Sequence, residues 1–483
     1  MAQSIQSLRA LALAAQREGA PDVAERLHRQ IVADWPDALE SWDFLCVAAA
    51  KRGDFAASAE ALQHYLDIED CSASAWRSLG IAEMQEKKWV EALAAFQEAL
   101  KLEPDVRVNL IYVGGAAIKA GQQTLAADSL SLALQGIPAD ELAADGGDIE
   151  PVLAEILDEA VQFLEDYLAE LISDGEELSG QLKGASWRLH ETSSPEWNDH
   201  RQRPGRFFMS AIAPQPWYDL KEFPWGEKLE AAYSDIRHEV TTALSHADAS
   251  PYIAGHTLEA QHWDSLADND DWTAVHLYSG GYPNARQAAK FPKTLAALKG
   301  LPICQKGGNP VEVFFSLLAP GGHIVPHYGT SNARLTAHLP ILVPRQKGAA
   351  TVSVGGITRD VEPGKLMTFD DSFRHEARND GDSLRINLIF EVWNPALSQS
   401  EVKAVEAMNE RFNSWFMGRG RRMAFLGATL AEAVQANNLY ENGAEALYRD
   451  NLQEGERLMR QALCLNPDHK RARRYFEDAR QLG

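Results

Sequence analysis

The sequence predicts a multidomain protein of α and β structure, with an N-terminal α-solenoid, a central β-sandwich or barrel and a C-terminal helical segment. Three observations support this fold class. A 34-residue period runs through the first part of the chain, short apolar runs between tight turns fill the middle, and amphipathic helical patterning returns near the end. A length of 483 residues also exceeds that of one ordinary domain.

Composition and charge are those of a globular protein that avoids polyanions. Apolar residues make up 45% of the chain and charged residues 24%. The formal net charge is −23, and most of it lies in residues 1–185. An acidic front half repels nucleic acid and anionic membranes, so neither is an expected partner.

A cytoplasmic location is expected from the targeting signals and the cysteines. We find no run of about 18 apolar residues that would predict a membrane span. Residues 8–15 are apolar, but the run is short and no cleavage site follows it, so no signal peptide is expected. The four cysteines are scattered and fit neither a disulfide framework nor a zinc site.

A 34-residue repeat organises residues 1–138. Glycines, small residues and prolines carry the period, at Gly19, Gly53 and Gly121 (with Lys87 in the vacant slot), at Ala24, Ser58, Ala92 and Ala126, and at Pro36, Pro104 and Pro138. A glycine at the turn between two helices takes a positive φ at little cost. One such unit cannot bury its own apolar face, so roughly four units are expected to stack.

The stretches Trp76–Gly80 and Trp89–Pro104 resemble the tetratricopeptide repeat, a 34-residue pair of helices. This resemblance implies a solenoid of tetratricopeptide repeats with a concave groove for a peptide or protein. A solenoid used only for spacing or oligomerisation is the alternative. Residues 139–185 are predicted to form an acidic capping helix and linker, because apolar residues between Pro151 and Ile172 follow i, i+3, i+4 spacing.

Residues 186–400 are predicted to form the β domain. The β-like runs are residues 206–212, 272–278, 311–318, 334–343, 350–354, 365–369 and 384–393. Turn residues such as Gly321–Gly322 and Pro363–Gly364 separate them. Short strands between tight turns indicate a sandwich or barrel, with residues 229–244 as a helix outside it.

Residues 401–483 are predicted to return to helix. Residues 400–416 are amphipathic, and the basic residues 418–422 are interpreted as a solvated turn. Residues 430–483 resemble one more degenerate helix pair, because Ala462–Pro467 repeats the pattern of Ala99–Pro104. Three roles stay open for this segment: it could cap the central domain, mediate dimers or pack on the front solenoid.

The residues with candidate chemistry lie at the ends of β-like runs. His327 follows one run, His375 lies in a polar turn 48 residues later, and Arg385 comes ten residues after His375. Two imidazoles suit a redox metal with open positions, and an arginine suits a dicarboxylic co-substrate. A facial triad would place a carboxylate two residues after the first histidine, where this chain has Gly329.

A family resemblance supports the metal site. The motifs are Pro326–Gly329, Asn332–Leu335 with His338, Phe369–Glu376, Arg385 and Val392–Pro395. Together they resemble the aspartyl/asparaginyl β-hydroxylase family of Fe(II)- and 2-oxoglutarate-dependent dioxygenases, over roughly residues 205–397. In that family two histidines alone hold the iron, and glycine at the place of Gly329 is usual. The resemblance therefore implies a double-stranded β-helix (jelly-roll) dioxygenase domain.

The resemblance also implies residue roles. His327 and His375 would bind the metal, Arg385 and Ser316 the distal carboxylate of 2-oxoglutarate, and His338 its other end. Asp370 and Asp371 would either orient His375 or only form the turn. Members of the family carry an arginine at the place of Thr336, and its absence here puts an aspartyl substrate in doubt. Arg334 is expected to take part of the role of that arginine.

The expected function is hydroxylation. Fe(II) and 2-oxoglutarate are the implied cofactors, with ascorbate as a reductant. A peptide or protein residue of aspartyl/asparaginyl or other type, presented by the repeats, is the expected substrate, and a homo-oligomer is open. Alternatives are a small-molecule or lipid-linked substrate, a repeat scaffold with an inactive dioxygenase domain, and a non-oxidative two-histidine metal protein.

Overall fold

The computed structural model describes residues 4–135, 151–187, 197–245, 248–252 and 270–482. These residues form two compact units. Residues 1–167 and 413–483 supply nearly all of the first, which we call the repeat unit, and residues 168–412 supply nearly all of the second, the sheet unit. The boundaries of the four predicted segments stay a prediction. Among the described residues, no helix has the length and apolar character that crossing a membrane requires.

Helical hairpins build the repeat unit, which confirms the predicted repeats. The helices of its first part are α1 (Ile5–Arg17), α2 (Pro21–Asp34), α3 (Leu39–Lys51), α4 (Phe55–Ile68), α5 (Ala73–Gln85), α6 (Trp89–Leu102), α7 (Arg107–Lys119) and α8 (Gln123–Ala133). The stretch predicted as a capping helix is α10 (Pro151–Ser173). Close packing explains the small residues, since a Cβ on Gly80 would meet the Phe96 ring at 2.5 Å.

Positive backbone φ marks the turn inside the hairpins. Gly19 and Gly53 have φ of 70° and 76°, and Lys87, which fills the vacant glycine slot, keeps φ at 59°. Asp450 has φ of 58° between α16 (Leu430–Tyr448) and α17 (Leu452–Leu465). The C-terminal hairpin therefore repeats the turn geometry of the N-terminal ones, as expected of a further helix pair.

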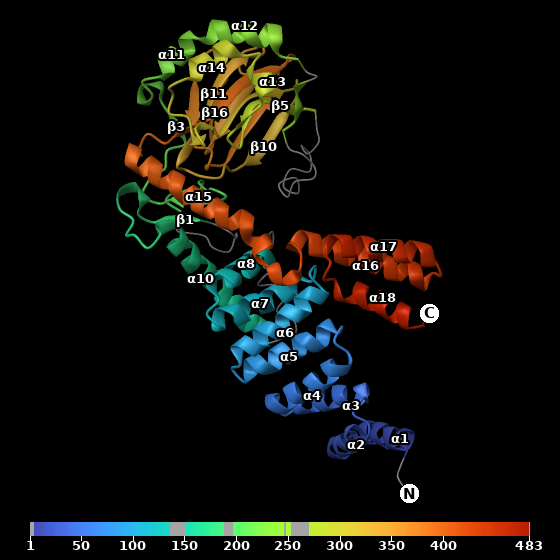
Figure 1. The fold of residues 1–483 in the computed structure, drawn as a ribbon. Helices are drawn as coiled ribbons and strands as arrows, with labels where there is room; N and C mark the ends of the chain where they lie inside the picture. The colour runs from blue at the N-terminus through green and yellow to red at the C-terminus, as the bar shows by residue number, and fades with distance from the viewer. Residues whose placement is uncertain (1–3, 136–150, 188–196, 246–247, 253–269, 483) are drawn as a thin grey trace. The chain divides into compact units, whose positions relative to one another are not determined.

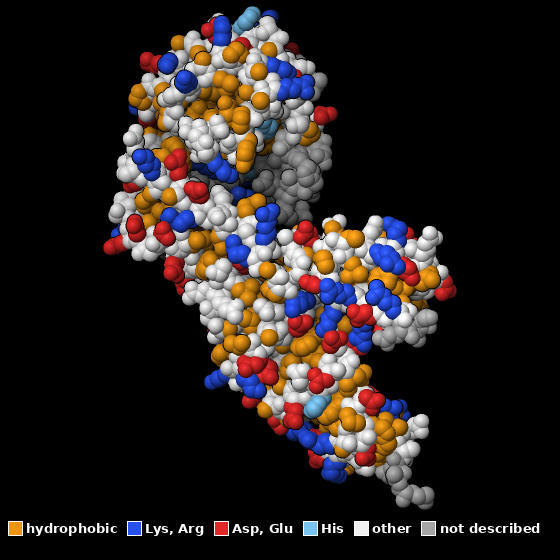
Figure 2. Space-filling view, viewed as in Figure 1, with side chains coloured by type: hydrophobic (Ala, Val, Ile, Leu, Met, Phe, Trp, Pro, Cys, Tyr) orange, Lys and Arg blue, Asp and Glu red, His pale blue; other side chains and the backbone are white. Residues whose placement is uncertain are grey.

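The C-terminal helices pack on the N-terminal solenoid at the end of α4 and the end of α6, which answers one of the three open roles. Helix α18 (Lys470–Leu482) follows the C-terminal hairpin. Lys470 Nζ lies 2.7 Å from an Asp70 carboxylate oxygen, and Arg474 pairs with Glu69 at 2.7 Å. Arg471 donates to the Leu102 carbonyl at 2.6 Å. In Figure 2, Lys and Arg side chains lie next to Asp and Glu side chains over this part of the repeat unit.

The basic stretch 418–422 is not a solvated turn, so that interpretation was wrong. It is the last turn of α15 (Gln399–Arg422). Arg422 donates to both carboxylate oxygens of Asp128 on α8, at 2.7 and 2.6 Å, and Arg419 is buried. The partner of the arginine lies 294 residues earlier in the chain, so no local pattern could reveal it.

Two antiparallel sheets form the sheet unit. The larger has the strand order β3-β14-β11-β16-β9-β5-β4, with β6 paired to β5, and the smaller has the order β10-β15-β12-β13. Their strands are β3 (Trp217–Tyr218), β4 (Ser250–Pro251), β5 (Trp272–Ser279), β6 (Tyr282–Pro283), β9 (Glu312–Leu318), β10 (His323–His327), β11 (Arg334–Leu342), β12 (Ala350–Val354), β13 (Ile357–Asp360), β14 (Met367–Phe369), β15 (His375–Asn379) and β16 (Arg385–Trp393).

Two short pairs lie beside these sheets. They are β1 (Ala185–Trp187) with β2 (Phe207–Met209), and β7 (Gln305–Lys306) with β8 (Asn309–Pro310). The helix predicted over residues 229–244 is two helices, α11 (Gly226–Ala231) and α12 (Tyr233–Ala243). Two more helices of this region are α13 (Ala285–Ala288) and α14 (Pro292–Leu298).

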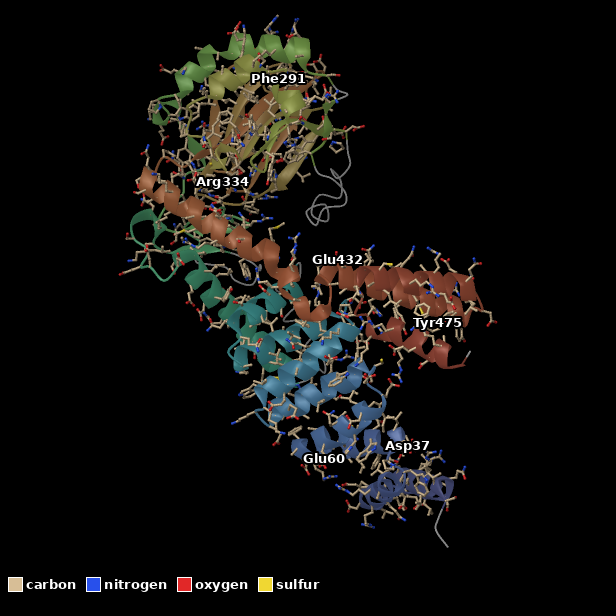
Figure 3. The ribbon with its side chains drawn as sticks, viewed as in Figure 1. Asp37, Glu60, Phe291, Arg334, Glu432 and Tyr475 are labelled. Atoms are coloured by element: carbon tan, nitrogen blue, oxygen red, sulfur yellow. The ribbon has the colours of Figure 1, made fainter. Side chains whose placement is uncertain are left out.

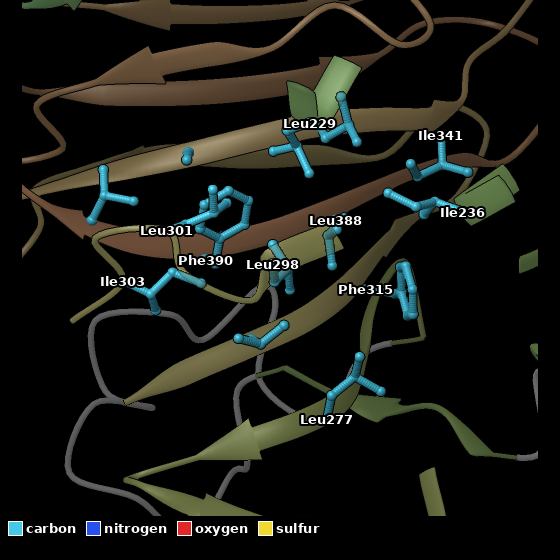
Figure 4. Packing of buried hydrophobic residues seen from close by; sticks show 14 of the residues in the cluster. Leu229, Ile236, Leu277, Leu298, Leu301, Ile303, Phe315, Ile341, Leu388 and Phe390 are labelled. Carbon is cyan, nitrogen blue, oxygen red and sulfur yellow. The ribbon is translucent and has the colours of Figure 1, made fainter. Parts of the chain in front are cut away.

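Apolar cores lie on both faces of the larger sheet. Figure 1 shows α11, α12 and α14 over its outer face. There Leu229 and Ile236 from the helices pack against strand residues such as Phe315, Leu388 and Phe390 (Figure 4). On the other face, Leu318 and Phe369 belong to a second cluster with Val352 and Phe373 of the smaller sheet and its turns. The space between the two sheets therefore holds the inward-pointing side chains.

Candidate functional site

The alternation of side chains places the predicted polar residues on the inner face of the larger sheet. Successive residues of a strand point to opposite faces. On β9, β11 and β16, Phe315, Leu339 and Leu388 lie in the outer core. Their neighbours Ser316, His338 and Asn387 must therefore face the smaller sheet. Each of these three side chains is buried.

His327 and His375 come together from the smaller sheet. His327 ends β10, His375 begins β15, and the two residues are register partners. Their ring centroids lie 3.9 Å apart. Each Nδ1 lies at hydrogen-bond distance from the carbonyl two residues earlier, 2.8 Å for Val325 and 3.0 Å for Phe373. Since a carbonyl only accepts, Nδ1 carries the proton in both rings and the lone pair is on Nε2.

Burial keeps both imidazoles neutral. It lowers the pKa of His375 to about 4. The pKa of His327 is held well below its usual value by burial first and by the nearby His375 second. A neutral ring with its proton fixed on Nδ1 is the form that binds a metal through Nε2.

Arg385 is a buried cation that has no hydrogen-bond partner in the part of the chain that the structure describes. It begins β16 and its side chain is fully buried. Among the described residues, nothing accepts a hydrogen bond from Nε, Nη1 or Nη2. Burial lowers the pKa of the guanidinium to about 10. Because a buried charge is normally paired, this guanidinium fits an anionic ligand that binds in two-pronged fashion.

Ser316 and Asn387 continue the same polar face. Asn387 is the register partner of Ser316, and Arg385 is that of Leu318, so Ser316 and Arg385 are diagonal neighbours. Trp272 on β5 donates its indole N–H to Ser316 Oγ at 3.1 Å. An indole only donates, so the serine accepts here and its own proton must go to another acceptor. Local sequence patterns predict only the β-like run that holds Trp272, not this contact, because Ser316 lies 44 residues further along the chain.

His338 contacts Asn387 and Phe369, and it lies close enough to Arg385 and His375 for their charges to affect its pKa. Its Nδ1 lies 3.4 Å from Asn387 Nδ2, and its ring meets Phe369 edge-on at 5.0 Å. Its pKa is held well below the usual value by burial, then by Arg385 and His375. The structure thus gathers Ser316, His338, Arg385 and the two metal-ligand candidates on facing sheets.

Arg334 lies far from Arg385 along the larger sheet. It begins β11 (Figure 3), where its register partner is Trp393, eight residues along β16 from Arg385. At about 3.3 Å per residue that is roughly 26 Å, longer than a five-carbon dicarboxylate. Arg334 donates to Glu391 at 2.5 Å and to Thr330 at 2.7 Å. The structure does not bring it to Arg385, and its co-substrate role stays a prediction.

Gly329 has a steric reason to be glycine. A Cβ there would lie 2.2 Å from Cγ and Oδ1 of Asp371. The Asp371 carboxylate also accepts a hydrogen bond from Thr336 Oγ1 at 2.9 Å. A carboxylate from the second histidine turn thus fills the volume where a triad carboxylate would start. Burial raises the pKa of Asp371 to about 6.

Asp370 has a different task from Asp371. Its Oδ1 accepts from the Ser372 backbone N–H at 2.9 Å and from the Ser372 hydroxyl. Its Oδ2 accepts from Gln202 Nε2 at 2.8 Å. Asp370 therefore forms the turn that precedes His375, while Asp371 packs against the first histidine turn.

The residues present fit a metal with a dicarboxylate beside it. Two neutral imidazoles offer nitrogen ligands, and the unpaired guanidinium next to a serine hydroxyl offers an anion site. Among the described residues, the one group of three close metal-ligating side chains, Glu69, Asp70 and Cys71, lies in the repeat unit. Its carboxylates already pair with Lys470 and Arg474.

Comparison with protein families identifies two segments. The family model described as aspartyl/asparaginyl beta-hydroxylase matches residues 230–395. The tetratricopeptide repeat model matches residues 73–106. Residues 230–395 therefore match a domain of the aspartyl/asparaginyl β-hydroxylase family. Both predicted resemblances are thereby confirmed. That β-hydroxylase domain contains all of the candidate site residues named above except Gln202.

Relatives with curated names resemble this β-hydroxylase domain. Aspartyl/asparaginyl beta-hydroxylase of Homo sapiens is 27% identical over 242 residues, which cover 47% of this chain and 30% of that protein. Ornithine lipid ester-linked acyl 2-hydroxylase of Rhizobium tropici is 26% identical over 228 residues, covering 44% of this chain and 78% of that protein. The chain thus spans less than a third of the human relative but most of the bacterial one.

The comparison with solved structures gives a partial match. The crystal structure of MamA covers 36% of this chain and 97% of its own, with 20% identity and a TM-score of 0.25. That score is too low to establish a common arrangement.

Proposed function

We propose that the sheet unit is an Fe(II)- and 2-oxoglutarate-dependent hydroxylase. In this proposal the two sheets are those of a double-stranded β-helix. The observation that carries the proposal is the fully buried Arg385 guanidinium, which has no partner among the described residues and shares a polar face with Ser316 and His338. A hydroxylase family model over the same residues supports it.

The residues divide the work as follows. Nε2 of His327 and of His375 would hold the metal, and their Nδ1 protons are fixed by the Val325 and Phe373 carbonyls. Arg385 would bind the distal carboxylate of 2-oxoglutarate, with the Ser316 hydroxyl as a further donor. With both cofactors bound, the centre would use dioxygen as the oxidant: one oxygen atom would enter succinate as 2-oxoglutarate loses carbon dioxide, and the other would be inserted into a C–H bond of the substrate. The apolar clusters around it exclude water from the reaction.

We consider two candidate classes of substrate. A peptide or protein presented by the tetratricopeptide repeats is the first candidate, because such arrays offer extended binding surfaces. A lipid-linked substrate is the second, favoured by the relative named for acyl 2-hydroxylation of an ornithine lipid. Thr336 hydrogen-bonds to Asp371 at the place where a family arginine would stand, which argues against a carboxylate-bearing target.

The test uses the full chain under anaerobic conditions with Fe(II). We expect 2-oxoglutarate to bind and, on addition of air, to yield succinate. Arg385→Gln should weaken 2-oxoglutarate binding about 100-fold or more, because the anion loses a desolvated, charge-assisted contact. The melting temperature without ligand should not fall, since an unpaired buried charge has been removed.

Two controls make the result interpretable. Arg378→Gln removes an arginine of β15 whose side chain is 46% exposed, and it should leave binding intact. His375→Ala should abolish succinate formation. If wild type and Arg385→Gln bind 2-oxoglutarate equally, the proposal is wrong. If the proposal holds, the two substrate candidates are separated by testing whether peptides or ornithine-lipid vesicles stimulate succinate formation.

A further inference from the structure

A segment before the β-hydroxylase match lies across both histidine turns. We call residues 201–209 the strap. The family model begins at residue 230, so the strap is outside it. Its contacts reach two turns that are far apart in the sequence: residues 329–332, which follow His327, and residues 370–374, which precede His375.

The strap binds the second histidine turn through backbone and side chain. Gln202 and Phe373 form an antiparallel bridge. Arg203 N–H donates to the Ser372 carbonyl at 2.7 Å, and Arg374 N–H donates to the Arg201 carbonyl at 3.0 Å. These bonds close both sides of the bridge, so the strap acts as an extra strand at this turn.

The same strap binds the first histidine turn three residues later. Gly205 N–H donates to the Gly329 carbonyl at 2.9 Å. The N–H groups of Arg206 and Phe207 both donate to the Thr330 carbonyl, at 3.0 and 2.9 Å. Asn332 exchanges two hydrogen bonds with the backbone of Met209, at 2.9 and 3.0 Å.

The strap is itself held in place by β1 and α15, which lie outside the two histidine turns. Its end is β2, which pairs with β1, and Phe207, Phe208 and Met209 are fully buried or nearly so. The Trp187 ring of β1 stacks on Phe412 of α15 with centroids 3.7 Å apart. A segment fixed in this way can set the separation of the two turns rather than follow it.

Gln202 is the side chain that links the strap to the base of the second turn. It is fully buried. Its Nε2 donates to Asp370 Oδ2 at 2.8 Å and lies 3.1 Å from Ser372 Oγ. Asp370 in turn caps the Ser372 N–H, so the amide of Gln202 fixes the carboxylate that shapes the turn before His375.

We propose that Gln202 is a positioning residue of the metal site, which acts through Asp370 and the strap to hold His375 opposite His327. This inference rests on the proposed function, because it takes the two histidines as metal ligands. Residues that orient a metal ligand from behind typically change metal affinity by about 10- to 100-fold when they are removed. Gln202 touches neither substrate nor cofactor in this scheme.

The experiment measures Co(II) binding to the full chain, as affinity and as the visible absorption spectrum of the bound ion. Gln202→Met keeps the length of the side chain but loses its amide. We expect Co(II) affinity to fall by about 10-fold or more, with an altered spectrum. The matched control is Thr294→Val, which removes the buried hydrogen bond of Thr294 to Glu239, outside the site. It should lower the melting temperature to a similar extent and leave Co(II) binding unchanged.

A rescue distinguishes positioning from loss of stability. Gln202→Glu combined with Asp370→Asn restores the contact with donor and acceptor exchanged, and it should recover most of the Co(II) affinity. If Gln202→Met loses only stability and keeps the wild-type affinity and spectrum, the inference is wrong. If wild type and His375→Ala bind Co(II) alike, the proposed function itself fails and the inference fails with it.

Discussion

The side chain of Asp371 explains why residue 329 is glycine, and a substitution that adds a single Cβ atom tests this explanation. Gly329 does not have a positive φ, so its backbone would accept alanine. Gly329→Ala should nevertheless cost about 1–3 kcal/mol of unfolding free energy, because the new Cβ displaces the Asp371 carboxylate from Thr336. Denaturant unfolding followed by intrinsic fluorescence measures this loss.

A double-mutant cycle checks the cause. Asp371→Ala removes the atoms that the new Cβ would meet. Gly329→Ala should then cost little in the Asp371→Ala background, so the two losses should be strongly non-additive. Additive losses would mean that the carboxylate does not dictate the glycine.

Sequence spacing predicts candidate site residues with unusual chemistry, but it does not predict the residues that support them through hydrogen bonds. His327, His375 and Arg385 stand out because histidine and arginine at strand ends are rarely structural together. Trp272 and Gln202 carry no such sign. Each forms a hydrogen bond to a strand or turn more than 40 residues away, and local sequence patterns do not predict hydrogen bonds between residues so far apart.

At the scale of elements, the first residues of α18 contain a pH-sensitive contact. His469 is buried, and its Nδ1 accepts the Ala472 N–H at 3.2 Å, as an N-cap does. Burial, and then the nearby Arg471, lowers its pKa to about 4. Its ring also lies 5.1 Å from Tyr440 of α16. Protonation would remove the acceptor and place a charge next to Arg471.

The sign of the effect follows from the two pKa values. The undocked helix, with an ordinary histidine pKa near 6.5, takes up a proton before the docked one does. The docked state of α18 is therefore favoured above about pH 6.5 and should weaken as the pH falls toward 4. Hydrogen exchange of residues 470–480 between pH 7 and pH 5 measures it. His469→Asn keeps an N-cap acceptor without the titration, and it should flatten this pH dependence.

For whole-molecule stability, each unit has its own core, so we expect thermal unfolding in two transitions. A ligand that binds only the native sheet unit stabilises that unit alone. Calorimetry with and without Co(II) plus 2-oxoglutarate should therefore move one transition and leave the other in place. A single transition that shifts as a whole would show that the helices shared by the two units, α10 and α15, couple their unfolding.

The sequence predicted the repeats and the hydroxylase domain well because both are expressed in local patterns. A 34-residue period marks the N-terminal hairpins, and even the degenerate pair predicted in residues 430–483 keeps the pattern of Ala462–Pro467. The basic end of α15 was misread for the opposite reason. Arg422 is paired with Asp128, which lies 294 residues earlier in the chain, so the residues around Arg422 do not predict this ion pair.

The sheet unit is inserted between the two parts of the repeat unit, and this has a consequence for how the chain is made. Residues 1–167 leave the ribosome first, but the ion pairs of Lys470 and Arg474 with Asp70 and Glu69 span about 400 residues. Since domains generally fold as units during synthesis, the sheet unit can fold before Lys470 and Arg474 have been translated. The surface of the N-terminal repeats that α18 covers therefore stays exposed until all of the sheet unit has been translated.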